Sequence, residues 1–138
     1  MEDVIRFGVS MESKLLQKFD ELTKQKNYNN RSEAIRDLIR DFIVENQQES
    51  EDTEMIGTIT YVFNHEVREL NDKLTEMQHR HFKNVISTMH VHLDEHNCLE
   101  VMIVKGTSKT ITKIADEIIS TKGVKHGKLV MTTTGKNI

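Results

Sequence analysis

The sequence predicts an α+β protein built from two segments with different hydrophobic periods. Residues 1–46 contain one alternating stretch followed by two amphipathic helical stretches. Residues 55–138 contain the order strand, helix, strand, strand, helix, strand. The polar stretch between them, residues 47–54, has no period and is expected to be a linker or a frayed helix end. We therefore expect two domains joined by this linker.

The stretch "VIRFGVS" predicts a half-buried strand, because Ile5, Phe7 and Val9 alternate with other residues. No second strand follows nearby, so we expect this strand to pair with the same strand of a second copy and form an antiparallel ribbon. Such a ribbon fits the major groove of B-DNA, where an arginine can contact guanine. The alternative is a strand that only dimerises. The outward residues of the ribbon would be Arg6, Gly8 and Ser10.

Two amphipathic helices are expected at residues 11–26 and 31–46, with an asparagine-rich turn between them. Asn30, followed three residues later by Glu33, makes a capping-box-like start to the second helix. The exposed N-terminus of that helix is suited to hold a DNA phosphate. The residues expected to do so are Asn30, Arg31 and Ser32.

The C-terminal segment predicts the split βαβ, or ferredoxin-like, arrangement, in which both helices cover one face of a four-stranded sheet. The other face of the sheet would be open to a partner or to water. The expected strands are 56–63, 85–93, 98–106 and 125–133, and the expected helices are 65–78 and 108–123.

The stretch "STMHVHLDEHNCLEVMIV" holds three histidines and the only cysteine of the chain. His90 and His92 are two apart on a predicted strand, so they share one face of the sheet. If the five residues "LDEHN" form a hairpin loop, His92 pairs with Cys98 and His90 with Glu100. We expect this polar set to lie on the open face, with the intervening apolar residues facing the helices.

Two imidazoles and a thiol suit late first-row ions: zinc if the site is tetrahedral, copper(II) or nickel(II) if it is tetragonal. His79 lies off the apolar stripe of its helix and could supply a fourth ligand to another chain, while Glu100 could orient an imidazole. The alternative is that the histidines are surface residues and Cys98 a small buried hydrophobe. The remaining histidines are expected to be loop, cap or packing residues: His65, His81, His96 and His126. Additional metal sites at His65, His81 or His96 are left open.

Composition restricts the class of function. The net charge of −3 gives no reason to expect non-specific binding to nucleic acid or to an anionic membrane. The chain has no apolar run long enough to span a bilayer, no signal-peptide pattern and a single cysteine, so a cytoplasmic protein is expected. There is no glycine-rich phosphate loop and no evident partner to activate Cys98 as a nucleophile, so we do not expect an enzyme.

The whole chain resembles the nickel-responsive NikR-type repressors. The stretches "RFGVS" and "NNRSEAIRDLIRDF" are similar to their ribbon-helix-helix DNA-binding half, and "HVHLDEHNCLE" to their metal-binding half. The resemblance implies that the C-terminal domain is ACT-like and assembles a homotetramer, a dimer of dimers. It also implies one Ni(II) per chain, in a planar site made by His90, His92 and Cys98 of one chain and His79 of another.

The resemblance further implies that nickel binding lets the protein occupy a palindromic operator in double-stranded DNA and repress a nickel-uptake gene. Gln78 and Glu100 match residues that contact the ligands in the family, and Glu33 and Asp37 match a pair that holds a further cation between the domains. Two positions depart from the family pattern. Gly8 replaces the usual base-contacting side chain, and Val67 stands where some members have a basic DNA-contacting residue, although Arg68 follows it.

Two other classes of protein share part of the pattern. A metal-storage or metal-chaperone protein would need the histidines and the cysteine but neither Arg6 nor the ribbon. A ribbon-helix-helix antitoxin would share the first fifty residues, but its tail usually folds on a toxin, whereas the second half of this chain has its own strand and helix periods.

Overall fold

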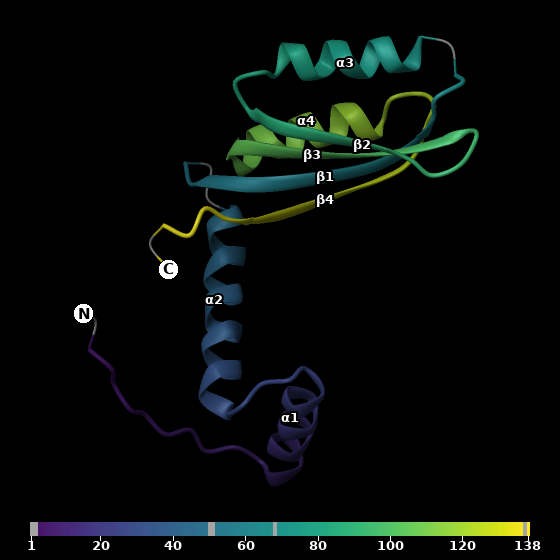
Figure 1. Cartoon of the computed structure of the whole chain (residues 1–138). Helices are drawn as coiled ribbons and strands as arrows, with labels where there is room; N and C mark the ends of the chain where they lie inside the picture. The colour runs from purple at the N-terminus through teal and green to yellow at the C-terminus, as the bar shows by residue number, and fades with distance from the viewer. Residues whose placement is uncertain (1–2, 50–51, 68, 137) are drawn as a thin grey trace. The chain divides into compact units, whose positions relative to one another are not determined.

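The structure is a computed structural model, which describes residues 3–49, 52–67, 69–136 and 138 (Figure 1). The chain divides into two compact units, residues 1–42 and 43–138. The boundary falls inside helix α2 (Arg31–Glu49), and strand β1 (Glu54–Asn64) begins soon after that helix. The predicted linker, residues 47–54, therefore overlaps the last turn of α2 and the first residue of β1.

In the first unit, α1 (Ser13–Gln25) and the first part of α2 correspond to the two predicted helices. The side chain of Asn30 accepts a hydrogen bond of 2.9 Å from the backbone N–H of Glu33, which satisfies a free donor in the first turn of α2. Residues 3–12 form neither helix nor strand in the single chain. Their apolar side chains are exposed, Val4 at 87% and Phe7 at 70%, so the predicted strand has no partner here.

Two side-chain contacts join α2 to the residues that precede it. Arg31 donates to both carboxylate oxygens of Asp20, at 2.9 and 2.8 Å, and the hydroxyl of Tyr28 donates to Asp37 at 2.6 Å. The hydrogen bond from Arg31 lowers the pKa of Asp20, and the bond to Asp37 raises the pKa of Tyr28. Among the described residues of this unit, Ala34 is the only buried hydrophobic one, so one copy leaves most of its apolar surface in water.

The second unit has the predicted βαββαβ order and forms one antiparallel sheet with the strand order β2-β3-β1-β4. Both of its helices lie on the same side of that sheet (Figure 1). The ferredoxin-like arrangement predicted from the sequence is confirmed. Besides β1, the elements are α3 (Leu70–Arg80), β2 (Val85–His92), β3 (Asn97–Thr107), α4 (Ser108–Ile119) and β4 (Val124–Thr133).

One helix begins later than the sequence predicts. A helix was expected from residue 65, but α3 starts at Leu70. The side chain of Asn64 accepts a hydrogen bond from the N–H of Glu66, and Glu69 has a φ of 69°. A left-handed residue cannot continue a right-handed helix, so the chain turns before α3 begins.

The core lies between the sheet and the two helices. Alternate residues of β1, among them Ile59, Tyr61 and Phe63, are at most 1% exposed and pack against the apolar faces of α3 and α4. A Cβ added to Gly57 would lie 2.6 Å from Cγ2 of Ile111 on α4, so a residue without a side chain is needed for α4 to approach the sheet this closely. Among the described helices, none is both long and apolar enough to cross a membrane.

The open face of the sheet is not the one expected from the sequence. The alternate residues Cys98, Met102 and Val104 of β3 are fully buried on the helix-covered side. Met89 and Val91, which were expected to face the helices, are 64% and 40% exposed on the other side. The expectation was wrong because both faces of β3 carry apolar residues, so alternation alone could not decide which face the helices cover.

Candidate metal centre

The hairpin between β2 and β3 has the predicted register, with His92 opposite Cys98 and His90 opposite Glu100. Its loop is held by Asp94, whose carboxylate accepts hydrogen bonds of 2.8 Å from the backbone N–H groups of His96 and Asn97. The side-chain amide of Asn97 also donates to this carboxylate, and that bond together with the two backbone bonds lowers the pKa of Asp94 to about 2. The loop therefore fixes the spacing between His92 and Cys98.

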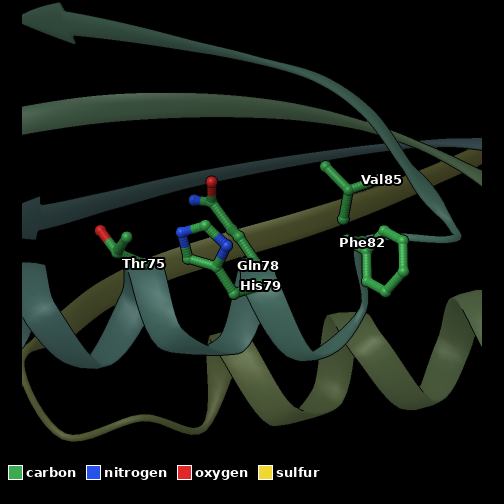
Figure 2. Close-up of a pocket in the computed structure, with 5 residues that line it drawn as sticks. All are labelled: Thr75, Gln78, His79, Phe82 and Val85. Atoms are coloured by element: carbon green, nitrogen blue, oxygen red, sulfur yellow. The ribbon is translucent and has the colours of Figure 1, made fainter.

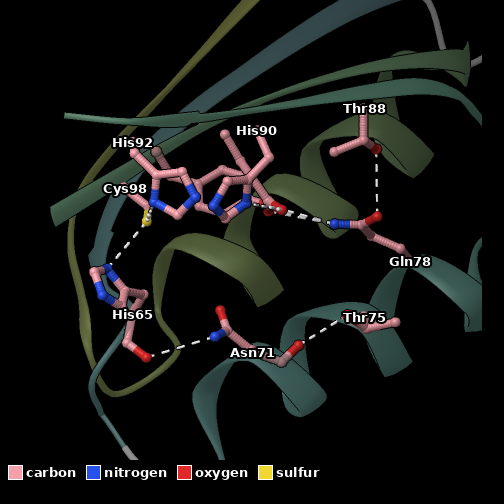
Figure 3. A network of polar contacts seen from close by, with 10 residues as sticks. His65, Asn71, Thr75, Gln78, Thr88, His90, His92 and Cys98 are labelled. Carbon is pink, nitrogen blue, oxygen red and sulfur yellow. Dashed lines mark hydrogen bonds and ion pairs between the residues drawn. The ribbon is translucent and has the colours of Figure 1, made fainter. Parts of the chain in front are cut away.

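Three donor atoms meet at the end of this hairpin (Figure 3). The sulfur of Cys98 lies 3.3 Å from Nδ1 of His92 and 3.3 Å from Nδ1 of His65. One ligand atom from each of the three residues lies within 4.8 Å of the other two. Nitrogen and sulfur donors in such a group suit a late first-row divalent ion, so the residues present fit a metal.

From the sequence, His65 was expected to be a loop, cap or packing residue, although an extra metal site there was left open; in the structure its ring lies beside the thiol. It follows β1, and β1 pairs with β3 so that Phe63 is opposite Cys98. The residue two positions beyond Phe63 is thereby brought to the end of the hairpin. That position depends on a strand pairing between segments more than thirty residues apart, which local hydrophobic periods do not reveal.

The thiol of Cys98 is buried. Burial raises its pKa, and the negative charges of Glu100 and Asp94 raise it further. Without a metal the sulfur is therefore held as a thiol near neutral pH, and a divalent ion would have to displace its proton to bind the thiolate.

His90 lies beside this group, but its ring is engaged elsewhere. Its Nδ1 is 3.2 Å from a carboxylate oxygen of Glu100. The centroid of its ring is 5.0 Å from that of His92 and 5.8 Å from that of Phe63, which is buried under the helices. The predicted ligands therefore lie on the helix-covered side of the sheet and not on the open side.

A polar network joins Gln78 to Thr88 and reaches His90 (Figure 3), and the carboxylate of Glu100 lies within it. The hydroxyl of Tyr61 on β1 donates to the carboxylate of Glu100, and the side-chain amide of Gln78 on α3 donates to the same oxygen at 3.4 Å. Thr88 on β2 donates to the carbonyl of Gln78 at 3.3 Å. Burial raises the pKa of Tyr61, and the bond to Glu100 adds to this. The predicted neighbours of the ligands, Gln78 and Glu100, are thus in contact with each other, and Glu100 also contacts His90.

His79 is not part of this group within the same chain. It is exposed on α3, in a shallow pocket of about 180 Å³ (Figure 2). The pocket is lined also by Thr75, Gln78, Phe82 and Val85. A metal ligand at His79 would therefore have to act on an ion held by another chain.

The predicted DNA-binding residues lie in the first unit, with one exception. Arg6, Gly8 and Ser10 are exposed in the extended N-terminal segment, and Ser32 is exposed at the start of α2. The guanidinium of Arg31 is paired with Asp20. Arg68, in the second unit, is outside the described residues.

The predicted cation pair, Glu33 and Asp37, lies one turn apart on α2. The carboxylate of Asp37 already accepts a hydrogen bond from Tyr28 and lies 3.3 Å from Arg40. Any cation at this pair would have to share the carboxylate with these two groups.

Two family models match the chain. Residues 5–45 match the model of ribbon-helix-helix proteins of the CopG family, and residues 56–132 match the C-terminal nickel-binding domain of NikR. Together the two matches include both units of the structure.

Similar proteins cover the whole chain. A protein of Caldanaerobacter subterraneus subsp. tengcongensis is 81% identical over 100% of this chain and 90% of its own length. Proteins of Geobacter metallireducens and Thermococcus kodakarensis are 57% and 56% identical, over 100% and 98% of this chain and 99% and 98% of their own lengths. All three are described as nickel-responsive regulators.

Proposed function

This chain belongs to the NikR family of nickel-responsive regulators, and on that premise we propose that it represses nickel-uptake genes when Ni(II) is bound. Its first half is a ribbon-helix-helix DNA-binding domain, and its second half is a nickel-binding domain with a four-stranded sheet. The observation that carries the proposal is the buried thiol of Cys98 in contact with imidazole nitrogen at the end of the β2–β3 hairpin.

The nickel ligands we propose are His90, His92 and Cys98 of one chain and His79 of a second chain. His90 and His92 share the face that carries Cys98, and Glu100 holds Nδ1 of His90, so that Nε2 of this ring would be the nickel ligand. The exposure of His79 on α3 supports a role towards another chain. Bound nickel would supply a centre that links two chains; the thiolate, the imidazoles and Glu100 set its position.

The polar network gives this site a connection to α3. Gln78 contacts Glu100, which contacts His90, and Gln78 is followed directly by His79. A change at His90 in one chain therefore acts on the helix that carries His79. His79 would bind the nickel ion of another chain. We therefore propose that nickel binding at one site positions His79 for the site in the neighbouring chain.

For DNA binding we propose that two first units pair through their N-terminal segments. The exposed apolar side chains of residues 4–9 support this pairing, because a second copy would bury them. Arg6, Gly8 and Ser10 would face the major groove, while Asn30, Arg31 and Ser32 would lie near phosphates, with Arg68 as a further contact. A homotetramer would carry two such pairs to a palindromic operator, with twofold symmetry in both partners.

We also propose a second cation site, a role without catalysis and a cytoplasmic location. Glu33 and Asp37 form a candidate site for a second cation. The regulator acts by binding and does not catalyse a reaction. It works in the cytoplasm, where its DNA target would be.

The test uses the full chain and three variants: Cys98→Ala, His79→Ala and, as a matched control, His126→Ala, which removes an exposed histidine of β4. Nickel is titrated while absorption, tetramer mass and operator binding are followed. We expect a thiolate-to-nickel charge-transfer band at one nickel per chain and nickel-dependent operator binding in the parent and the control. Both should be lost in the Cys98 and His79 variants. Operator binding that is unchanged in Cys98→Ala would overturn the proposal, and nickel binding without any DNA binding would favour a storage protein.

A further inference from the structure

His65 forms part of a metal-binding group that does not need a second chain. Its Nδ1 and that of His92 each lie 3.3 Å from the sulfur of Cys98. Sulfur and nitrogen ligands of one tetrahedral zinc ion, at ordinary bond lengths, lie about 3.5 Å apart. Each nitrogen–sulfur distance is therefore within a few tenths of an ångström of its value around a zinc ion, and the three donor atoms lie within 4.8 Å of one another.

A backbone hydrogen bond keeps the segment that carries His65 next to the hairpin. The backbone N–H of His65 donates to the carbonyl of His96 at 3.0 Å, which ties the segment after β1 to the hairpin loop. His90, in contrast, lies 3.2 Å from Glu100 and is outside the group. His92 and Cys98 thus have two alternative histidines beside them that could complete a metal site. These are His65 and His90.

We infer that His65, His92 and Cys98 form a single-chain site for zinc, which is an alternative to the nickel site that uses His90 and His79 of a second chain. Zinc accepts three protein ligands with a water in the fourth position, whereas nickel(II) on nitrogen and sulfur donors favours a tetragonal set. The His65 set closes within one protomer and leaves His90 on Glu100.

The two sites exclude each other, because each chain has one Cys98 and one His92. Zinc bound by His65, His92 and Cys98 would not need His79 of a second chain as a ligand. It would therefore occupy the hairpin end without linking two chains. This competition rests on the proposed function, whereas the zinc site itself does not. The competition would let the protein discriminate between zinc and nickel by which histidine binds the ion, His65 or His90, and not by affinity alone.

The experiment titrates the full chain with zinc against a chromophoric chelator, and separately with nickel by absorption. The variants are His65→Ala, His65→Gln, His90→Ala and, as a control at the neighbouring hairpin loop, His96→Ala. The side chain of His65 takes no part in the backbone bond to His96, so both His65 variants should keep the fold, which circular dichroism checks.

We expect one zinc per chain in the parent and a loss of zinc affinity of at least about tenfold in both His65 variants, with the nickel band unchanged. His90→Ala should lose the nickel band and keep zinc, and His96→Ala should keep both. Unchanged zinc affinity in the His65 variants, or an equal loss in His90→Ala, would overturn the inference. If the parent shows no nickel band, the proposed function fails, while a zinc loss restricted to the His65 variants still supports the zinc site.

Discussion

The hydroxyl of Tyr61 donates a hydrogen bond to the carboxylate of Glu100, whose other oxygen lies 3.2 Å from Nδ1 of His90. Tyr61 is 1% exposed, so its ring is fixed by the core and its hydroxyl holds the carboxylate in one place. Tyr61 contacts none of the proposed metal ligands. Through Glu100 it nevertheless sets the orientation of the His90 ring.

Tyr61→Phe should keep the packing of the ring and remove the bond to Glu100. We expect the free energy of unfolding to fall by about 1–2 kcal/mol, because a hydrogen bond to a charged acceptor is lost. Nickel affinity should fall about tenfold, because Glu100 no longer holds His90 in one orientation. Denaturant unfolding and competitive nickel titration measure the two effects.

The matched control is Tyr28→Phe, which removes a tyrosine–carboxylate bond of the same kind in the first unit, to Asp37. It should lower stability and leave nickel affinity unchanged. An equal loss of nickel affinity in both variants would show that Tyr61 acts on the site only through general stability.

Asp94 provides the prediction about pH. Its pKa of about 2 in the folded chain lies below the value of about 3.9 in an unfolded chain. Its contribution to stability is therefore fully present above about pH 4 and is lost as the pH falls towards 2. Asp94→Ala should be less stable than the parent at pH 7, and the difference should shrink by pH 3. Denaturant midpoints at the two pH values measure this.

The control for that variant is Asp94→Asn, which keeps an oxygen acceptor for the loop N–H groups but carries no charge. It should be destabilised less than Asp94→Ala, and its own stability should vary less with acid than that of the parent. A difference between parent and Asp94→Ala that stays constant from pH 7 to pH 3 would mean that the loop does not depend on the carboxylate charge.

The order of the elements could be read from the sequence because each is set by a local period. The strand around Tyr61 alternates over its whole length, and α4 has apolar residues at helical spacing. The pairing of His92 with Cys98 was also predictable, since a short hairpin loop fixes the register of its two strands. These features depend on residues close together in the chain.

The features that could not be predicted depend on long-range packing. Which face of β3 meets the helices is decided by α3 and α4 together, because residues on both of its faces are apolar. The place of His65 beside Cys98 follows from the pairing of β1 with β3, and the start of α3 follows from the left-handed turn at Glu69. No local pattern marks any of the three.

Gly57 provides the prediction about the core. Its added Cβ in Gly57→Ala would lie 2.6 Å from Ile111 and 3.1 Å from Val104, so α4 would have to move away from the sheet. We expect a loss of about 1–3 kcal/mol in the free energy of unfolding, measured by denaturant titration. Gly8→Ala is the control, because a Cβ there meets nothing within 4 Å. Equal stability of the two variants would contradict the close approach of α4.

Arg6 provides the prediction about DNA. In the proposed ribbon its guanidinium reaches a base edge, so Arg6→Ala should cost about 1–3 kcal/mol of discrimination between operator and random DNA. Arg31 is the contrast, because it lies at the start of α2, where a phosphate contact is expected. Its guanidinium is paired with Asp20 of α1. Arg31→Ala should weaken binding to both DNAs alike and reduce its dependence on salt. Binding of both variants in the presence of nickel, measured on the two DNAs at several salt concentrations, separates the roles. If Arg6→Ala weakened binding to random DNA as much as to operator, Arg6 would be a phosphate contact and the ribbon would read sequence through other residues.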